Sequence, residues 1–97
     1  MRIEILESAR EDLDLGRSFY EQQKPGLGDS FLDSIISDIE SLRLFAGVHA
    51  LHFERYHRLL SKRFPFAVYY RVEGEIVRIF AILDCRQNPD TGAQRLK

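Results

Sequence analysis

Two adjacent apolar segments near the C-terminus constrain the fold more than any other feature. Residues 66–72 and 76–83 are rich in the β-branched and aromatic side chains that strands favour. Between them stands Glu73-Gly74, where the glycine tolerates the positive φ that a tight hairpin turn requires. Residues 57–63 form a third strand-like run just before them. Together these segments predict a β-meander of three strands.

The N-terminal half has the three-to-four-residue apolar periodicity of two amphipathic helices. The two stripes are Ala9, Leu13, Gly16 and Tyr20, and then Phe31, Ile35, Ile39 and Leu42. Ser8 with Glu11 has the spacing of a capping box, and Asp29 or Ser30 is placed to cap the second helix. Asp12 falls outside the first stripe, so we expect it to be solvated with the other charged side chains.

Shorter signals complete the order of elements. Residues 2–6 alternate polar and apolar, as a half-buried strand does, and the Pro-Gly-rich segment 24–28 separates the helices. We expect a loop at residues 45–56 and an irregular tail at residues 86–97. The order β-α-α-β-β-β predicts an α+β fold, with a helical hairpin packed on one face of a small, mostly antiparallel sheet. One such domain accounts for residues 1–97.

The charge of the chain is distributed unevenly. Residues 1–45 hold ten acids and five bases, a balance of −5, whereas residues 46–97 hold five acids and nine bases, a balance of +4. The asymmetry indicates an acidic helical half and a basic sheet half. It fits either a basic working face that an acidic partner covers or solvated charges that merely segregate.

Five basic residues in and after the strands are the candidate binding residues: Arg58, Lys62, Arg71, Arg78 and Arg86. An arginine fork can hold a carboxylate or a phosphate at two points. Strand alternation would place Arg58 and Lys62 on one face. We expect the helices to leave the other sheet face open, with some of these arginines on it. Edge-strand charge that discourages aggregation is the alternative explanation, above all for Arg71.

Metal and cofactor signals are weak. His49-x-x-His52 lacks the further ligands of a tetrahedral zinc site, and no glycine-rich phosphate loop follows a strand. We therefore expect neither a metal nor a cofactor. The lone Cys85 fits a reducing cytosol and is expected to be buried beside the last strand. No apolar run approaches the roughly 20 residues of a membrane span, so we expect a cytoplasmic protein without a membrane segment.

The order of elements and several motifs resemble the RelE/ParE superfamily of bacterial toxins. The resemblance runs over nearly the whole chain, and its most specific parts are Phe64-Pro65-Phe66 with Tyr69-Tyr70-Arg71, and Arg86-Gln87-Asn88-Pro89. It implies the toxin of a type II toxin–antitoxin system that inhibits growth and is neutralised by a cognate antitoxin. Association as a homodimer or as a hetero-oligomer with the antitoxin stays open. The target would be DNA gyrase in the ParE branch, or messenger RNA on the ribosome in the RelE branch.

Comparison with the RelE branch favours the ParE branch. Arg58 and Arg86 match two basic positions of RelE-type nucleases. However, Ala67 stands where an arginine is expected, Gly92 stands near the place of a terminal tyrosine, and Asp84 stands where a histidine is common. A gyrase poison needs only a binding surface, so these departures do not weaken that interpretation.

Two alternatives remain at this stage. The first is a metal-independent mRNA endoribonuclease, for which the catalytic candidates are Arg58, Arg86, His57 and Asp84, with Glu54 as a further acid. The second is an inactive relative that acts as a binding module.

Overall fold

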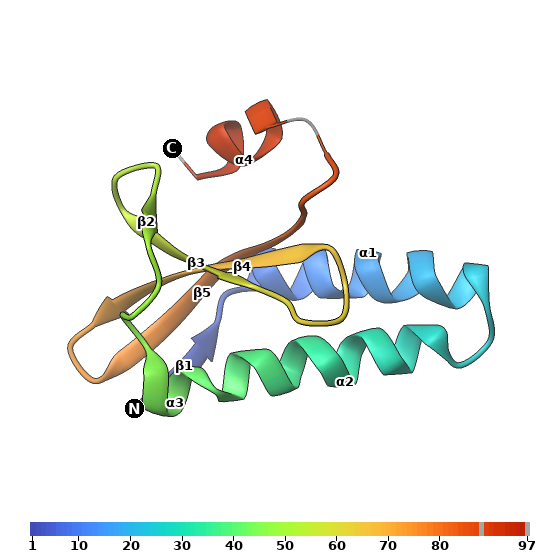
Figure 1. The fold of residues 1–97 in the computed structure, drawn as a ribbon, viewed down its shortest axis with the longest axis horizontal. Helices are drawn as coiled ribbons and strands as arrows, with labels where there is room; N and C mark the ends of the chain where they lie inside the picture. Colours follow the sequence, from blue (N-terminus) through green and yellow to red (C-terminus); the bar gives the residue numbers. More distant parts are fainter. Residues whose placement is uncertain (88, 97) are drawn as a thin grey trace.

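A five-stranded mixed sheet with helices on both sides forms the protein in the computed structural model, which describes residues 1–87 and 89–96 (Figure 1). The elements are β1 (Arg2–Ile5), α1 (Glu7–Gln23), α2 (Leu27–Glu40), α3 (Leu42–Phe45), β2 (Leu51–His52), β3 (Tyr56–Leu60), β4 (Phe66–Glu73), β5 (Ile76–Asp84) and α4 (Pro89–Arg95). The strand order is β1-β5-β4-β3-β2. β1 is parallel to β5 and the other neighbours are antiparallel, which confirms the predicted α+β class.

The main core lies between the helical hairpin and one face of the sheet. Both predicted helical stripes are confirmed as buried, and they pack against Phe66, Val68, Tyr70, Val77 and Ile79 from β4 and β5. Tyr20, Phe31 and Phe66 form an aromatic cluster at one end of this core. Gly16 is part of the stripe because a Cβ there would lie 2.6 Å from the Phe31 ring.

A second core lies on the opposite face of the sheet, and two predictions are wrong there. The tail is not irregular, because α4 folds over this face on the side away from α2 (Figure 1). Leu96 packs there with Tyr56, Ala67, Tyr69 and Ala81. Tyr69 and Tyr70 point to opposite faces of β4, and both are buried, each in a different core. The face expected to be open is therefore partly covered.

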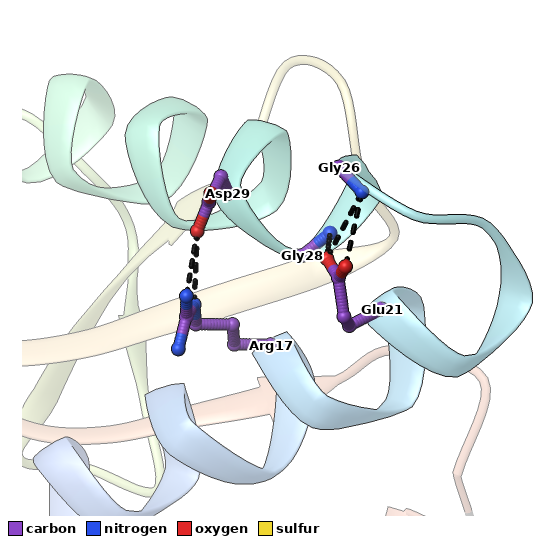
Figure 2. A network of polar contacts seen from close by, with 5 residues as sticks. All are labelled: Arg17, Glu21, Gly26, Gly28 and Asp29. Atoms are coloured by element: carbon purple, nitrogen blue, oxygen red, sulfur yellow. Dashed lines mark hydrogen bonds and ion pairs between the residues drawn. The ribbon is translucent and has the colours of Figure 1, made fainter.

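The helix starts differ from the predicted capping boxes. α1 begins at Glu7, and the Ser8 hydroxyl donates to the Phe80 carbonyl instead of capping the helix. α2 begins at Leu27, after Gly26 at φ +87°. Its cap comes from the preceding helix: the Glu21 carboxylate accepts hydrogen bonds from the backbone N–H groups of Gly26 and Gly28 (Figure 2).

The β4–β5 hairpin is confirmed and sets the direction of the arginines. Gly74 has φ +62°, as the predicted turn requires. Tyr69 pairs with Ala81 and Tyr70 with Ile79, so Phe80 is an extra residue that shifts the register. Beyond this irregularity Arg71 and Arg78 stand directly opposite each other. The segment 45–56, expected to be a loop, also contains the end of α3 and the short edge strand β2.

Candidate functional site

A pocket of about 210 Å³ lies between α4 and the second face of the sheet. We call it the α4 pocket; it is lined by His52, Phe53, Arg58, Tyr69, Leu83, Asp84, Cys85, Gln87, Thr91 and Gly92. The strands supply its floor, α4 supplies one wall, and the β2–β3 turn supplies another. Of the predicted site residues, Arg58 and Asp84 meet here.

Arg58 lies on β3 opposite Tyr69 of β4, and both side chains enter the α4 pocket. Phe53 reaches the pocket from a turn in which Phe53 and Glu54 have φ of 55° and 68°, a conformation that non-glycine residues seldom adopt. Its ring lies 6.0 Å from that of Tyr69, centroid to centroid. Within residues 1–87 and 89–96, no carboxylate forms an ion pair with Arg58. The pocket thus combines an arginine with two aromatic rings.

Asp84 is held by Arg86 rather than by Arg58. Its carboxylate accepts hydrogen bonds from the Arg86 guanidinium at 2.7 and 3.0 Å and from the Arg86 backbone N–H at 2.8 Å. Arg86 holds the pKa of Asp84 below its usual range, against a smaller effect of burial. The charge of Arg86 also lowers the pKa of Tyr20 in the main core, although burial raises that pKa overall. Arg86 therefore lies at the α1 side of Asp84, and it does not line the α4 pocket.

Arg71 and Arg78 form a separate basic site near the β4–β5 turn. The carboxylate of Glu73 lies 3.7 Å from Nη1 of Arg71 and 3.2 Å from Nε of Arg78. The carboxylate of Glu4 in β1 lies 3.9 Å from Nη2 of Arg78. The guanidinium of Arg71 also lies over the Phe80 ring. Two arginines directly opposite would repel each other, and Glu73 between them offsets this repulsion. Both arginines are paired within the chain and remain more than a third exposed.

His57, a catalytic candidate, points to the face opposite its neighbour Arg58. Its ring stacks on Tyr70, and its Nδ1 bonds to the carbonyl oxygen of His49. His49 in turn bonds to the Tyr70 hydroxyl, which also accepts from the Gly47 N–H. Burial, and then the nearby charge of His57, lowers the pKa of His49. These contacts hold the chain between α3 and β2 against the sheet, on the face opposite the Arg58 side chain.

Lys62 and Cys85 differ from the predictions. β3 ends at Leu60, so strand alternation does not extend to Lys62, which lies with Arg63 beside α2. Cys85 is exposed rather than buried. Partial desolvation still raises the pKa of its thiol, while the charge of Arg58 acts in the opposite direction.

Asp12 is a buried charged residue whose role in holding α4 the sequence did not predict. It is 8% exposed, and its carboxylate forms two hydrogen bonds of 2.9 Å to the guanidinium of Arg95 in α4. It also accepts from the backbone N–H of Ile82. Asp12 thus ties α4 to both α1 and β5. The pair is 83 residues apart in sequence, so no local pattern indicates it.

The structure therefore separates the predicted site residues into five places, one of which is that of His57 against Tyr70. Arg58 and Asp84 line the α4 pocket, Arg86 lies beside Asp84, Arg71 and Arg78 share Glu73, and Lys62 lies beside α2. In the described part of the chain, no three His, Cys, Asp or Glu side chains gather in a way that could hold a metal ion.

Residues 3–89 match the family model described as the ParE toxin of the type II toxin–antitoxin system parDE. The chain belongs to the ParE toxin family. A solved structure of the chromosomal ParDE TA system from P. aeruginosa contains a chain of similar fold, with a TM-score of 0.77. The alignment covers 84% of the present chain and 92% of that chain, at 23% identity. No curated protein matches the sequence.

The family assignment confirms the predicted resemblance to the ParE branch. The ParE toxins of this family belong to type II toxin–antitoxin systems, in which the toxin is accompanied by an antitoxin. Among the residues described, no helix of this ParE-family chain is both long and apolar enough to cross a membrane.

Proposed function

We propose that this ParE-family chain is a cytoplasmic toxin that inhibits growth by poisoning DNA gyrase and that a cognate antitoxin neutralises it. The match to the ParE toxin model over residues 3–89 carries the proposal. The position of His57, apart from the other catalytic candidates, supports a toxin that acts through binding. Acid–base chemistry on RNA needs its groups within hydrogen-bond reach of one reacting centre. His57 lies on the opposite face from Arg58, and Arg86 is engaged by Asp84.

The test is expression of the chain alone from a tightly repressed promoter, with the fate of DNA and RNA followed. We expect growth arrest, DNA breaks, an SOS response and intact transcripts. Purified gyrase should accumulate cleaved DNA when the purified chain is added. Co-expression of the protein encoded beside the toxin should restore growth. Normal growth with folded protein present would refute the proposal and would favour the alternative that the chain is an inactive relative acting as a binding module.

Ribosome-dependent RNA cleavage is the second candidate, because Arg58, Asp84 and Tyr69 line one pocket. An arginine there could stabilise a pentavalent phosphate, as nucleases that act without metal require. Transcripts cut within codons on translating ribosomes, with no DNA breaks, would establish this activity instead. Arg58→Gln should then abolish cleavage, whereas Arg71→Gln, in the separate basic site, should not.

A further inference from the structure

We propose that the α4 pocket receives a single carboxylate side chain of the antitoxin, bound by the Arg58 guanidinium in the pocket that Phe53 and Tyr69 also line. The inference rests on the proposed toxin–antitoxin function and names the group that the pocket recognises. It assigns to Arg58 a role that its neighbours on β4 and β5 do not share.

The charge of Arg58, unlike those of Arg71, Arg78 and Arg86, is unmatched among the described residues. Arg71 and Arg78 on the adjacent strands share Glu73, and Arg86 is paired with Asp84. Arg58 is half-buried in the pocket, and no carboxylate of the described residues reaches it at ion-pair distance. A partly desolvated guanidinium is best satisfied by an oxyanion that accepts two parallel hydrogen bonds. The rings of Phe53 and Tyr69 line the same pocket, with their centroids 6.0 Å apart.

The volume of the α4 pocket limits the size of the group that it can receive. The pocket holds about 210 Å³ and is closed on one side by Thr91 and Gly92 of α4. Pockets for nucleotides and other small molecules usually have volumes of roughly 300–1,000 Å³. The α4 pocket therefore fits one inserted side chain better than a nucleotide.

The charges around the α4 pocket limit the kind of anion that it accepts. Asp84 lines the same pocket, and Arg86 keeps its pKa low, so it is ionised at neutral pH. A phosphate monoester carries about −1.5 to −2 charges and is repelled by Asp84 more strongly than a carboxylate with one negative charge. Residues 46–97 carry a balance of +4, which attracts an acidic polypeptide toward this half of the molecule. Charge disfavours a phosphate monoester, but a phosphodiester carries one negative charge as a carboxylate does, so it is size that favours an aspartate or glutamate of a protein partner over a nucleotide.

The binding test uses N-acetylglutamate N-methylamide as the probe, with the glutamine analogue as its uncharged isostere. Binding to the purified chain is followed by the NMR signals of the backbone N–H groups of Tyr69 and Thr91, which line the α4 pocket and are present in every variant. We expect saturable shifts with the glutamate probe and at least about tenfold weaker binding of the glutamine probe. Arg58→Gln should abolish the response, Arg58→Lys should weaken it, and Arg71→Gln should leave it unchanged. Equal binding of the two probes, or binding that survives in Arg58→Gln, overturns the proposal.

His52 provides an independent readout. The charge of Arg58 lowers the pKa of His52, in addition to the larger effect of partial burial. A carboxylate bound to Arg58 should therefore raise the His52 pKa, and the glutamine probe should not. Inorganic phosphate and a 2′-deoxydinucleotide test the other source of an oxyanion. If either shifts the Tyr69 and Thr91 signals at lower concentration than the glutamate probe, the pocket is a nucleic-acid site and the proposal fails.

The outcome is distinguishable from failure of the proposed function. Probe binding is measured on the isolated chain and does not depend on toxicity. If the chain does not arrest growth yet binds the glutamate probe through Arg58, the toxin proposal fails while the carboxylate site stands. If the chain arrests growth but does not bind the glutamate probe, the carboxylate site fails while the toxin proposal stands. Circular dichroism of each variant shows that the fold is retained.

Discussion

Removal of Arg95 should release α4 and destabilise the whole domain. Asp12 is 8% exposed, and two of its three hydrogen bonds come from the Arg95 guanidinium. In Arg95→Ala, only the backbone N–H of Ile82 would remain for this carboxylate. Removing one partner of a wholly buried pair costs about 3–5 kcal/mol, because the other charge is left uncompensated.

The structure sets a smaller value for this pair. The side chain of Arg95 is 34% exposed, so water can reach the carboxylate of Asp12 once the guanidinium is gone. We therefore expect a loss of about 2 kcal/mol in the free energy of unfolding. For a domain of this length that corresponds to a fall of about 10 °C in Tm.

The assay is urea unfolding followed by far-ultraviolet circular dichroism, fitted to a two-state transition. Arg86→Ala is the matched control, because Arg86 also forms a two-point pair with an aspartate, Asp84, but is 56% exposed. Its loss should cost no more than about 1 kcal/mol. Equal losses for the two variants would refute the argument from burial. The double variant Asp12→Ala/Arg95→Ala should lose less free energy of unfolding than the two single variants lose together.

Three further predictions concern the helical hairpin and the α3–β2 segment. Gly16→Ala should destabilise the protein by about 1–2 kcal/mol in urea unfolding, because overpacking against Phe31 outweighs the gain of about 1 kcal/mol in helix propensity. Glu21→Ala should cost about 1 kcal/mol, as loss of a helix cap does, and should increase amide hydrogen exchange at the start of α2. His49 should make stability pH-dependent. Because burial lowers the pKa of His49 in the folded protein, the unfolded chain binds this proton more readily. The stability that His49 contributes is therefore present above about pH 6.5 and is lost as the pH falls through the folded pKa. Urea midpoints between pH 5 and 8, compared with those of His49→Gln, measure this effect.

Gly92→Ala is the control for Gly16→Ala. A Cβ at Gly92 would lie 3.4 Å from the Phe53 ring, in ordinary contact, so the same substitution should be neutral or stabilising. If both variants lost the same stability, close packing at Gly16 would not be the cause. For His49, a pH profile identical to that of His49→Gln would contradict the linkage. For Glu21, unchanged exchange at Gly26 and Gly28 would show that the cap contributes little.

Periodicity predicted the elements that bury a long stripe. The stripes of α1 and α2, and the apolar runs of β4 and β5, occupy the positions expected, because each buries a regular face against the same core. The short α4 does not have such a stripe. Its signals were Pro89 at the first helical position and Asp90 in the first turn, both typical of a helix start.

Contacts between distant residues were beyond the reach of local patterns. The capping-box search considers residues three apart, whereas the cap of α2 is Glu21, five and seven residues from its donors. Asp12 was expected to be solvated because its partner, Arg95, is 83 residues away. The sequence identified Arg58 and Arg86 as candidates. Only the structure assigns them different surroundings, because β5 ends and the chain turns between Asp84 and Arg86.

The parallel pairing of β1 with β5 has a consequence for synthesis of the chain. Arg2 pairs with Ile76, so the first strand has no sheet neighbour until almost the whole domain exists. At about 5–20 residues per second, a ribosome needs roughly 4–15 s to reach that point. Contacts of such long sequence separation also slow folding, since loop closure precedes any gain from pairing. The complete ParE-family fold therefore forms only after most of the chain has been synthesised.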